Sequence, residues 1–252
     1  MSRVFVTSDT HGCALRLVDC LAQAGFDYQN DTLIHLGDVV DRGNDSKGVV
    51  DLLLGIKNLI SIKGNHDHWW LQYLVMRHQA PHIMSHMTQG GIATVESYIN
   101  ETGQLEVPIE HELFFKNQRI HYTDEQGRFF CHAGYDRMEK IENQEETVFS
   151  WDRELMREAI KLKDGEDLPD VNNFKRVFIG HTATTYYTEE QVHGTAMSAS
   201  AILDNINAAH PKRCTSPIYK GNIVDVDTGG CYGGKISLLD ITDDDNHILY
   251  QA

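Results

Sequence analysis

The stretch Val4-Phe5-Val6-Thr7-Ser8-Asp9-Thr10-His11 carries an apolar, strand-like run into two side chains that bind metal ions. Four later segments place metal-binding or phosphate-binding groups after a similar run: Gly37-Asp38-Val39-Val40-Asp41-Arg42-Gly43, Gly64-Asn65-His66-Asp67, His132-Ala133-Gly134 and Gly180-His181-Thr182. Carboxylates, imidazoles and an amide oxygen suit a pair of divalent first-row ions that meet a phosphate. Composition alone does not account for five such segments in this order, so the sequence predicts a metal site.

The first 62 residues alternate between patterns typical of strands and of helices. The predicted elements are strands at 3–8, 31–36 and 59–62 and helices at 12–25 and 49–56. This alternation implies parallel pairing of the strands and an α/β core. Ligands of such a core bind at the carboxyl ends of its strands, where each quoted segment falls.

The remainder of the chain changes character twice. Residues 69–110, rich in His, Met and Gln, are interpreted as a helical insertion beside the site. Later predictions are strands at 113–115, 120–122, 129–131, 177–179, 223–226, 236–239 and 248–250, a helix at 151–162 and a polar loop at 163–173. No element is assigned to 193–217. Since no repeat or linker divides the chain, we expect a single domain over residues 1–252.

Composition limits the classes of partner. The chain has 252 residues, of which 41% are hydrophobic and 23% charged, as in a soluble globular protein. No apolar run reaches the roughly 18 residues of a membrane helix, and no signal peptide is recognised, so we expect a cytoplasmic protein without a membrane partner. The formal net charge of −15 disfavours nucleic acid as a partner. Five cysteines without CxxC spacing predict reduced thiols.

From Val4 to His181 the chain resembles the calcineurin-like metallophosphoesterases, most closely the bacterial and phage branch of the serine/threonine protein phosphatases. Further segments that fit this branch are Phe149-Ser150-Trp151-Asp152-Arg153, Gly90-Gly91 with Thr94 and Ser97-Tyr98, and Asp227-Thr228-Gly229-Gly230 before Tyr232-Gly233-Gly234-Lys235. The resemblance implies an α/β (α+β) fold in which two sheets form a β-sandwich flanked by helices.

The resemblance also implies a ligand set for two ions. Asp9 and His11 would bind the first ion, Asp38 would bridge both, and Asn65, His132 and His181 would complete the second. Mn²⁺ is the expected ion, with Fe, Zn and Ni as alternatives. The attacking group would be a hydroxide held between the ions.

Five of the six predicted ligands also have a structural interpretation. Asp38 could be a turn residue, Asn65 a helix cap and Asp9 an N-cap. His132 and His181 could be core histidines that bond to the backbone. The metal site is favoured because all of these residues occur together and in order.

Four residues are predicted to act on the phosphoryl group. By resemblance, His66 protonates the leaving group and Asp41 holds it by a hydrogen bond, an arrangement that suits a general acid. Arg42 and Arg153 are the predicted phosphate-binding groups, because a guanidinium matches two phosphoryl oxygens. Asn65 and His66 would also contact the substrate. A surface ion pair with neighbouring Glu154 is the alternative for Arg153.

Several other polar residues receive structural interpretations. His68, His78, His82 and His86 are interpreted as a solvated helix face, in preference to a second metal site. Asp225 and Asp227 are assigned to a turn. Asp67 stands where many phosphatases of the branch have Glu, so contacts on the substrate side are expected to differ.

The leading functional hypothesis is a binuclear metal-dependent phosphomonoesterase, specifically a serine/threonine protein phosphatase. Its partner would be a phosphorylated protein or a small phosphoester. One alternative is a hydrolase of diadenosine polyphosphates or other nucleotides, a group that tends to vary the residue at the Asp41 position. The other is a metal-binding module that docks a partner without catalysis. The sequence leaves the oligomeric state open.

Overall fold

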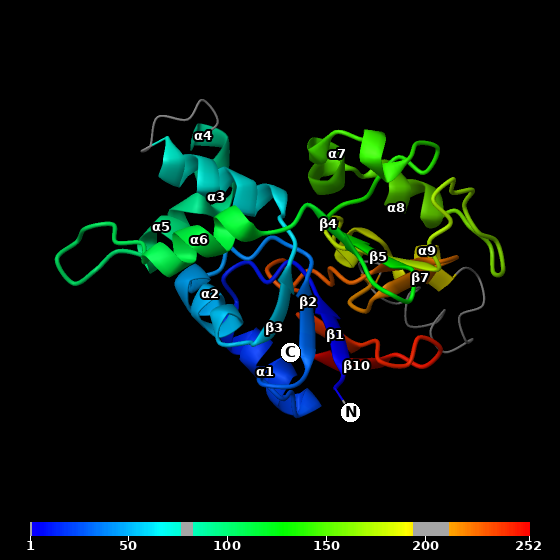
Figure 1. Ribbon diagram of the computed structural model, residues 1–252, viewed down its shortest axis with the longest axis horizontal. Coiled ribbons are helices and arrows are strands. Elements are labelled where there is room, and N and C mark those ends of the chain that lie inside the picture. Colours follow the sequence, from blue (N-terminus) through cyan, green and yellow to red (C-terminus); the bar gives the residue numbers. More distant parts are fainter. Residues whose placement is uncertain (1, 77–82, 194–211) are drawn as a thin grey trace.

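Two β-sheets form the centre of the structure (Figure 1). The computed structural model describes residues 2–76, 83–193 and 212–252. Within these residues, the strand order of the first sheet is β10 (Ile248–Gln251), β9 (Ser237–Asp240), β1 (Val4–Thr7), β2 (Thr32–His35) and β3 (Asn58–Ser61). The order of the second is β4 (His121–Thr123), β5 (Arg128–Cys131), β6 (Arg176–Ile179), β8 (Ile223–Asp225) and β7 (Ile218–Lys220).

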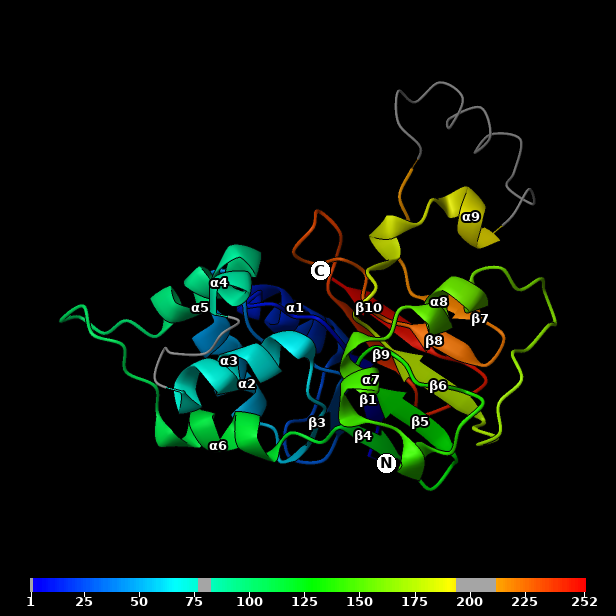
Figure 2. The ribbon, with the colours of Figure 1, turned by 90° about the horizontal axis from the view of Figure 1, so that it is seen from above.

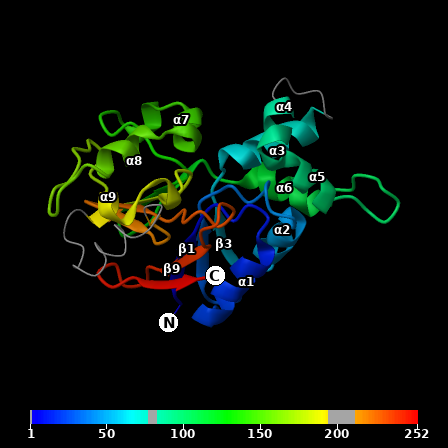
Figure 3. The ribbon, with the colours of Figure 1, turned by 180° about the vertical axis from the view of Figure 1, so that it is seen from behind.

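The alternation in the sequence produces the parallel half of the first sheet. β1 pairs with β2 and β2 with β3, both in parallel, and helices α1 (Ala14–Ala24) and α2 (Ser46–Leu54) make the connections. α1 ends at Gly25, whose φ of 55° is the left-handed conformation that glycine favours at a helix end. Strand β9 joins the other edge of β1 in the antiparallel direction (Figure 3).

Apolar side chains from both sheets fill the space between them: Val6, Ile34, Leu36, Ile62, Phe130, Phe178, Val224, Val226, Leu239 and Ile241. Helices cover the outer faces (Figure 2). α1, α2 and α6 (Ile109–Asn117) pack on the first sheet, α3 (Asn65–Val75) packs against α6, and α7 (Glu146–Trp151) and α8 (Glu154–Ala159) pack on the second sheet. This two-sheet sandwich flanked by helices confirms the predicted fold class.

The segment between β3 and β4 is helical for most of its described length. It contains α3, α4 (Ile83–His86), a π-helical turn (Met87–Gly91), α5 (Ile92–Ser97) and α6. The strand predicted at 113–115 is wrong, because these residues lie inside α6. A three-residue apolar run does not distinguish a strand from a buried helical turn, and here His111, Phe114 and Phe115 form the buried side of the helix.

The helix predicted at 151–162 is also wrong in its bounds. It is divided into α7 and α8 at Asp152, whose ψ of 143° is extended. The carboxylate of Asp152 accepts a hydrogen bond from the backbone N–H of Leu155 at 2.9 Å and so caps the start of α8. The break places Arg153 at the N-cap of α8, with a φ of −133° and a ψ of −7°.

The stretch 193–217, to which no element was assigned, falls largely outside the described residues. On its two sides lie α9 (Glu189–His193) and β7, a strand that the sequence did not predict. Two 3₁₀ turns, Ile141–Asn143 and Thr184–Tyr186, complete the elements. In the described part of the chain no helix has the length and apolarity needed to cross a membrane.

Candidate metal centre

Apart from Arg153, which lies between α7 and α8, the predicted site residues lie on loops at the carboxyl ends of β1, β2, β5 and β6 and at the start of α3. Most of these loops are strained. Six of the predicted site residues have positive φ: Asp9 (49°), His11 (40°), Asp38 (55°), Asp41 (74°), Arg42 (69°) and His181 (66°). Backbone hydrogen bonds between the first two loops hold this geometry, from Asp9 N to Gly37 O at 3.0 Å and from His11 N to Asp38 O at 2.9 Å. Left-handed backbone costs free energy in residues other than glycine and collects at functional sites.

Asp38 lies between two groups of potential ligands. One group contains His11, Asp38 and His66, the other contains Asp38, His132 and His181, and the ligand atoms within each lie within 4.8 Å of one another. Asn65 joins the second group, since its Oδ1 is 3.2 Å from His132 Nε2. The Asp9 carboxylate approaches the first, with Oδ1 3.9 Å from His11 Nε2.

Two imidazoles are oriented for metal binding by the backbone. The carbonyl oxygens of Val40 and Leu36 only accept hydrogen bonds, so Nδ1–H of His11 (2.7 Å) and Nδ1–H of His132 (2.9 Å) must donate to them. In the neutral rings Nε2 then carries a lone pair. Each Nε2 lies 3.5 Å from a carboxylate oxygen of Asp38, so acceptors face acceptors. A cation between them satisfies both.

Buried negative charge gives a second reason for cations at this place. Burial, followed by the charges of Asp9 and Asp67, raises the pKa of the Asp38 carboxyl well above its usual range. Burial and the charge of Asp9 likewise raise the pKa of Asp227. Among the described residues, the buried Nε2 of His181 has no hydrogen-bond partner. Together with the mixed oxygen and nitrogen donors, these features fit two divalent ions.

His66 and Asp41 form a buried pair beside this centre. His66 Nδ1 donates to Asp41 Oδ2 at 2.6 Å. Burial by itself would raise the pKa of Asp41, but the hydrogen bonds from His66 and His86 outweigh it, so the pKa lies below its ordinary value. Burial lowers the pKa of His66, although Asp41 opposes this shift. The remaining nitrogen, Nε2, is free of Asp41 and faces Arg42.

The two predicted phosphate-binding arginines contact different residues of the site. Arg42 donates to His66 Nε2 at 2.8 Å, contacts His11 Nε2, and lies 4.8 Å from the ring centre of Tyr232. Its guanidinium must leave His11 before that imidazole can bind an ion. Arg153 is partly buried and donates to Thr182 Oγ1 at 3.3 Å, next to His181. The surface ion pair joins Glu154 to Arg157 instead.

Asp67, where many phosphatases of the resembled branch have Glu, bonds to the inside of the protein. Its carboxylate is fully buried and points into the protein. It accepts hydrogen bonds from four donors: Asp38 N (3.0 Å), Val39 N (2.9 Å), Gly64 N (3.1 Å) and Gln118 Nε2 (2.9 Å). Asp67 therefore supports the backbone of the loop that carries Asp38.

The solvated-face interpretation is wrong for His86, which is only 1% exposed. Its Nε2 donates to Asp41 Oδ1 at 3.0 Å, and Thr94 Oγ1 donates to the same oxygen at 2.7 Å. His68 is exposed, as expected, while His78 and His82 lie outside the described residues. Asp227 accepts from Gly229 N at 3.0 Å, in keeping with its assignment to a turn. No spacing in the sequence indicated the contact of His86, because it joins residues 45 positions apart.

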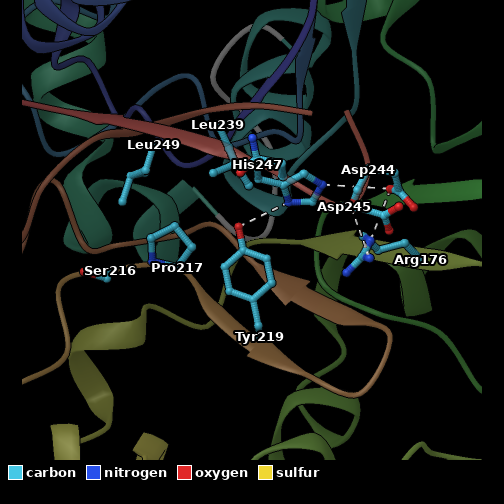
Figure 4. A pocket seen from close by; sticks show the side chains of 10 residues that line it. Arg176, Ser216, Pro217, Tyr219, Leu239, Asp244, Asp245, His247 and Leu249 are labelled. Atoms are coloured by element: carbon cyan, nitrogen blue, oxygen red, sulfur yellow. Dashed lines mark hydrogen bonds and ion pairs between the residues drawn. The ribbon is translucent and has the colours of Figure 1, made fainter. Parts of the chain in front are cut away.

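A separate cavity of about 530 Å³ lies where β7 approaches the segment before β10 (Figure 4). Its polar side chains bond mainly to one another. Arg176 Nε donates to Asp244 Oδ1 at 3.2 Å, and Tyr219 OH and His247 Nδ1 share a hydrogen bond of 3.3 Å. None of the predicted site residues lines this cavity.

Comparison with known proteins gives consistent matches. The family model for calcineurin-like phosphoesterases matches residues 2–193. Serine/threonine-protein phosphatase 1 of Salmonella typhimurium is 41% identical over 64 residues, which cover 25% of this chain and 29% of that protein. The symmetrical bis(5'-nucleosyl)-tetraphosphatase of Yersinia enterocolitica is 27% identical over 274 aligned residues, which cover 93% of this chain and 87% of that protein.

A solved structure agrees with the fold. The crystal structure of a protein proposed to be a diadenosine tetraphosphatase superposes with a TM-score of 0.61 at 20% identity. The superposition covers 100% of this chain and 94% of the other. At this identity the likeness concerns the arrangement of sheets and helices alone.

Proposed function

Because the chain belongs to the calcineurin-like phosphoesterase family, we propose that this hydrolase is a binuclear metal-dependent phosphomonoesterase acting on phosphoserine and phosphothreonine in proteins or peptides. Asp9, His11 and Asp38 would hold one ion. Asp38, Asn65, His132 and His181 would hold the other. When bound, such ions neutralise phosphoryl charge and supply a water nucleophile at neutral pH.

The observation that carries this proposal is the buried pair of His66 and Asp41, joined at 2.6 Å. An alkoxide such as that of serine leaves poorly unless it receives a proton. A nucleotide leaves as a phosphate whose own pKa is about 6 and needs little help. An imidazole held by a carboxylate beside the phosphoryl position therefore favours alkyl monoesters.

The residues of this chain would act one after another to transfer that proton to the leaving group. Arg42 binds two phosphoryl oxygens and so leaves His66 Nε2, which it contacts at 2.8 Å without substrate. The phosphoryl charge then favours a proton on Nε2. His66 delivers this proton to the leaving oxygen, while Asp41 keeps the ring oriented through Nδ1. Arg153 contacts the phosphoryl group from the side of His181.

A diadenosine polyphosphate hydrolase is the second candidate, because the Yersinia relative, matched over 93% of this chain, is a tetraphosphatase. Only two arginines, Arg42 and Arg153, are predicted to bind phosphate. A polyphosphate chain carries several charges and binds best to a larger number of cations, which argues against this candidate.

One experiment tests the proposal against its alternatives. Protein stripped by chelation and reloaded with Mn²⁺ is assayed on p-nitrophenyl phosphate, on phosphoserine, phosphothreonine and phosphotyrosine peptides, and on diadenosine tetraphosphate. We expect no turnover before reloading and a higher kcat/KM on the serine and threonine phosphopeptides. A clear preference for the dinucleotide would select the second candidate. Binding of Mn²⁺ without any turnover would select a non-catalytic module.

A further inference from the structure

Asp41 receives hydrogen bonds on both carboxylate oxygens, but only one of them leads to the predicted proton donor. His66 Nδ1 donates to Oδ2 at 2.6 Å, while His86 Nε2 (3.0 Å) and Thr94 Oγ1 (2.7 Å) donate to Oδ1. The three side chains of His66, Asp41 and His86 are 2% exposed or less. The two histidines thus lie on opposite sides of one buried carboxylate.

The backbone around His86 is shaped to bring it to this place. Gly91 lies against the His86 ring, and a Cβ at this position would come within 2.7 Å of it. Gly90 has a φ of 112°, and its carbonyl oxygen accepts from Arg42 N at 3.1 Å. Asp41 N donates to Thr94 Oγ1 at 2.8 Å. Residues 86–94 therefore hold the strained loop of Asp41 and Arg42 through its backbone and through a carboxylate.

A packing role alone does not explain an imidazole at position 86. The ring lies among aromatic side chains, with ring centres 6.1 to 6.4 Å from those of Trp69, Trp70 and Tyr73. Its Nδ1 is buried and has no hydrogen-bond partner among the described residues. Burial of an unpaired acceptor is unfavourable, so an apolar ring would pack better. The bond from Nε2 to Asp41 is the feature that only the imidazole supplies.

We propose that His86 is a positioning residue for the proton-transfer step. By donating to Oδ1 it prevents rotation of the Asp41 carboxylate, so that Oδ2 stays in line with His66 Nδ1–H. His66 then keeps Nε2 directed at the phosphoryl position. This inference rests on the proposed phosphomonoesterase function, and it extends the positioning of the donor from Asp41 to a third residue.

The test compares three substitutions at this position. His86→Phe keeps the ring and removes the donor. In His86→Gln, the amide nitrogen can take the place of Nε2 and donate to Asp41. In His86→Asn, the shorter amide cannot reach Asp41. Steady-state kinetics with saturating Mn²⁺ are measured on a phosphoserine peptide, which has a poor leaving group, and on p-nitrophenyl phosphate, which has a good one.

We expect His86→Phe to lower kcat on the phosphoserine peptide about 10- to 100-fold, the usual effect of losing a residue that orients a catalytic group. KM should stay within about twofold, since the phosphate contacts of Arg42 remain, and the loss on p-nitrophenyl phosphate should be far smaller. His86→Gln should recover most of the rate and His86→Asn little of it. In a His66→Asn background, His86→Phe should cause no further loss.

Several outcomes would overturn the inference. Equal losses on both substrates, or equal rates for His86→Gln and His86→Asn, would assign His86 a structural role. A further loss in the His66→Asn background would do the same. If His86→Phe does not fold, as judged by circular dichroism, the comparison of Gln with Asn still decides. A wild-type protein that turns over no phosphoester would overturn the proposed function, and this inference with it.

Discussion

Asp38→Asn should stabilise the metal-free protein while removing its response to metal. The Asp38 carboxylate is 3% exposed on its side chain and lies near the charges of Asp9 and Asp67, which together with burial raise its pKa. A carboxyl whose pKa rises on folding holds its proton more tightly in the folded state. Without metal, the folded protein therefore loses stability as pH rises above the ordinary carboxyl range. The amide carries no charge and avoids this loss.

The size of the effect follows from the contacts of the side chain. The amide oxygen can keep the hydrogen bond from His66 N, which Asp38 Oδ1 accepts at 3.0 Å. Its NH₂ group then takes the position of Oδ2, which lies 3.5 Å from His11 Nε2, and can donate to that nitrogen. We expect a gain of about 1–2 kcal/mol. For a chain of this length, this corresponds to a rise in Tm of roughly 2–8 °C.

The assay is thermal unfolding at pH 5 and pH 8, in chelator and in Mn²⁺. In chelator, the advantage of Asp38→Asn should be larger at pH 8. Mn²⁺ at 100 times its Kd should stabilise wild type by about 2.7 kcal/mol and the variant much less, so their order reverses. Asp225→Asn is the matched control, because Asp225 is also buried with a raised pKa but is not a predicted ligand. It should gain stability in chelator and keep its response to Mn²⁺.

The reasoning is refuted if Asp38→Asn melts below wild type in chelator at pH 8. That result would mean that the carboxylate makes favourable contacts in the metal-free protein that an amide cannot reproduce. An undiminished response of the variant to Mn²⁺ would separately contradict the assignment of Asp38 as the shared ligand.

Three further predictions concern single side chains. His66→Asn should lower kcat about 10²- to 10⁴-fold on alkyl phosphates and much less on p-nitrophenyl phosphate; an equal loss on both would give His66 a different role. Arg42→Ala should raise KM and lower kcat together, and Arg42→Lys should restore only part of the rate, because an ammonium lacks the fork of the guanidinium; full activity of the lysine variant would contradict this. Asp67→Ala should lower the free energy of unfolding by about 2–4 kcal/mol in urea titrations, since four donors lose their acceptor. A loss below about 1 kcal/mol would show that water replaces the carboxylate as the acceptor.

Regular patterns in the sequence determined the α/β core and the place of the site. A predicted, buried strand precedes each of four ligands: Asp9, Asp38, His132 and His181. Neighbouring parallel strands of one sheet bring their carboxyl ends to the same edge of that sheet. Local order places Asp9 beside Asp38 and His132 beside His181, while the packing of the two sheets brings His132 and His181 to Asp38. The prediction of strands was wrong where the apolar run was very short, as at residues 113–115, which are helical.

Tertiary structure alone decided which residues support the site. Asp67 turns into the protein to accept hydrogen bonds from backbone N–H groups of the Asp38 loop, although its neighbour His66 faces Arg42. His86 reaches Asp41 across 45 residues, and Thr94 across 53. The local sequence specifies residue type and the repeat of a helix or strand. It does not specify which distant segment packs against a side chain, and this packing determines whether a histidine is solvated or, like His86, holds a buried carboxylate.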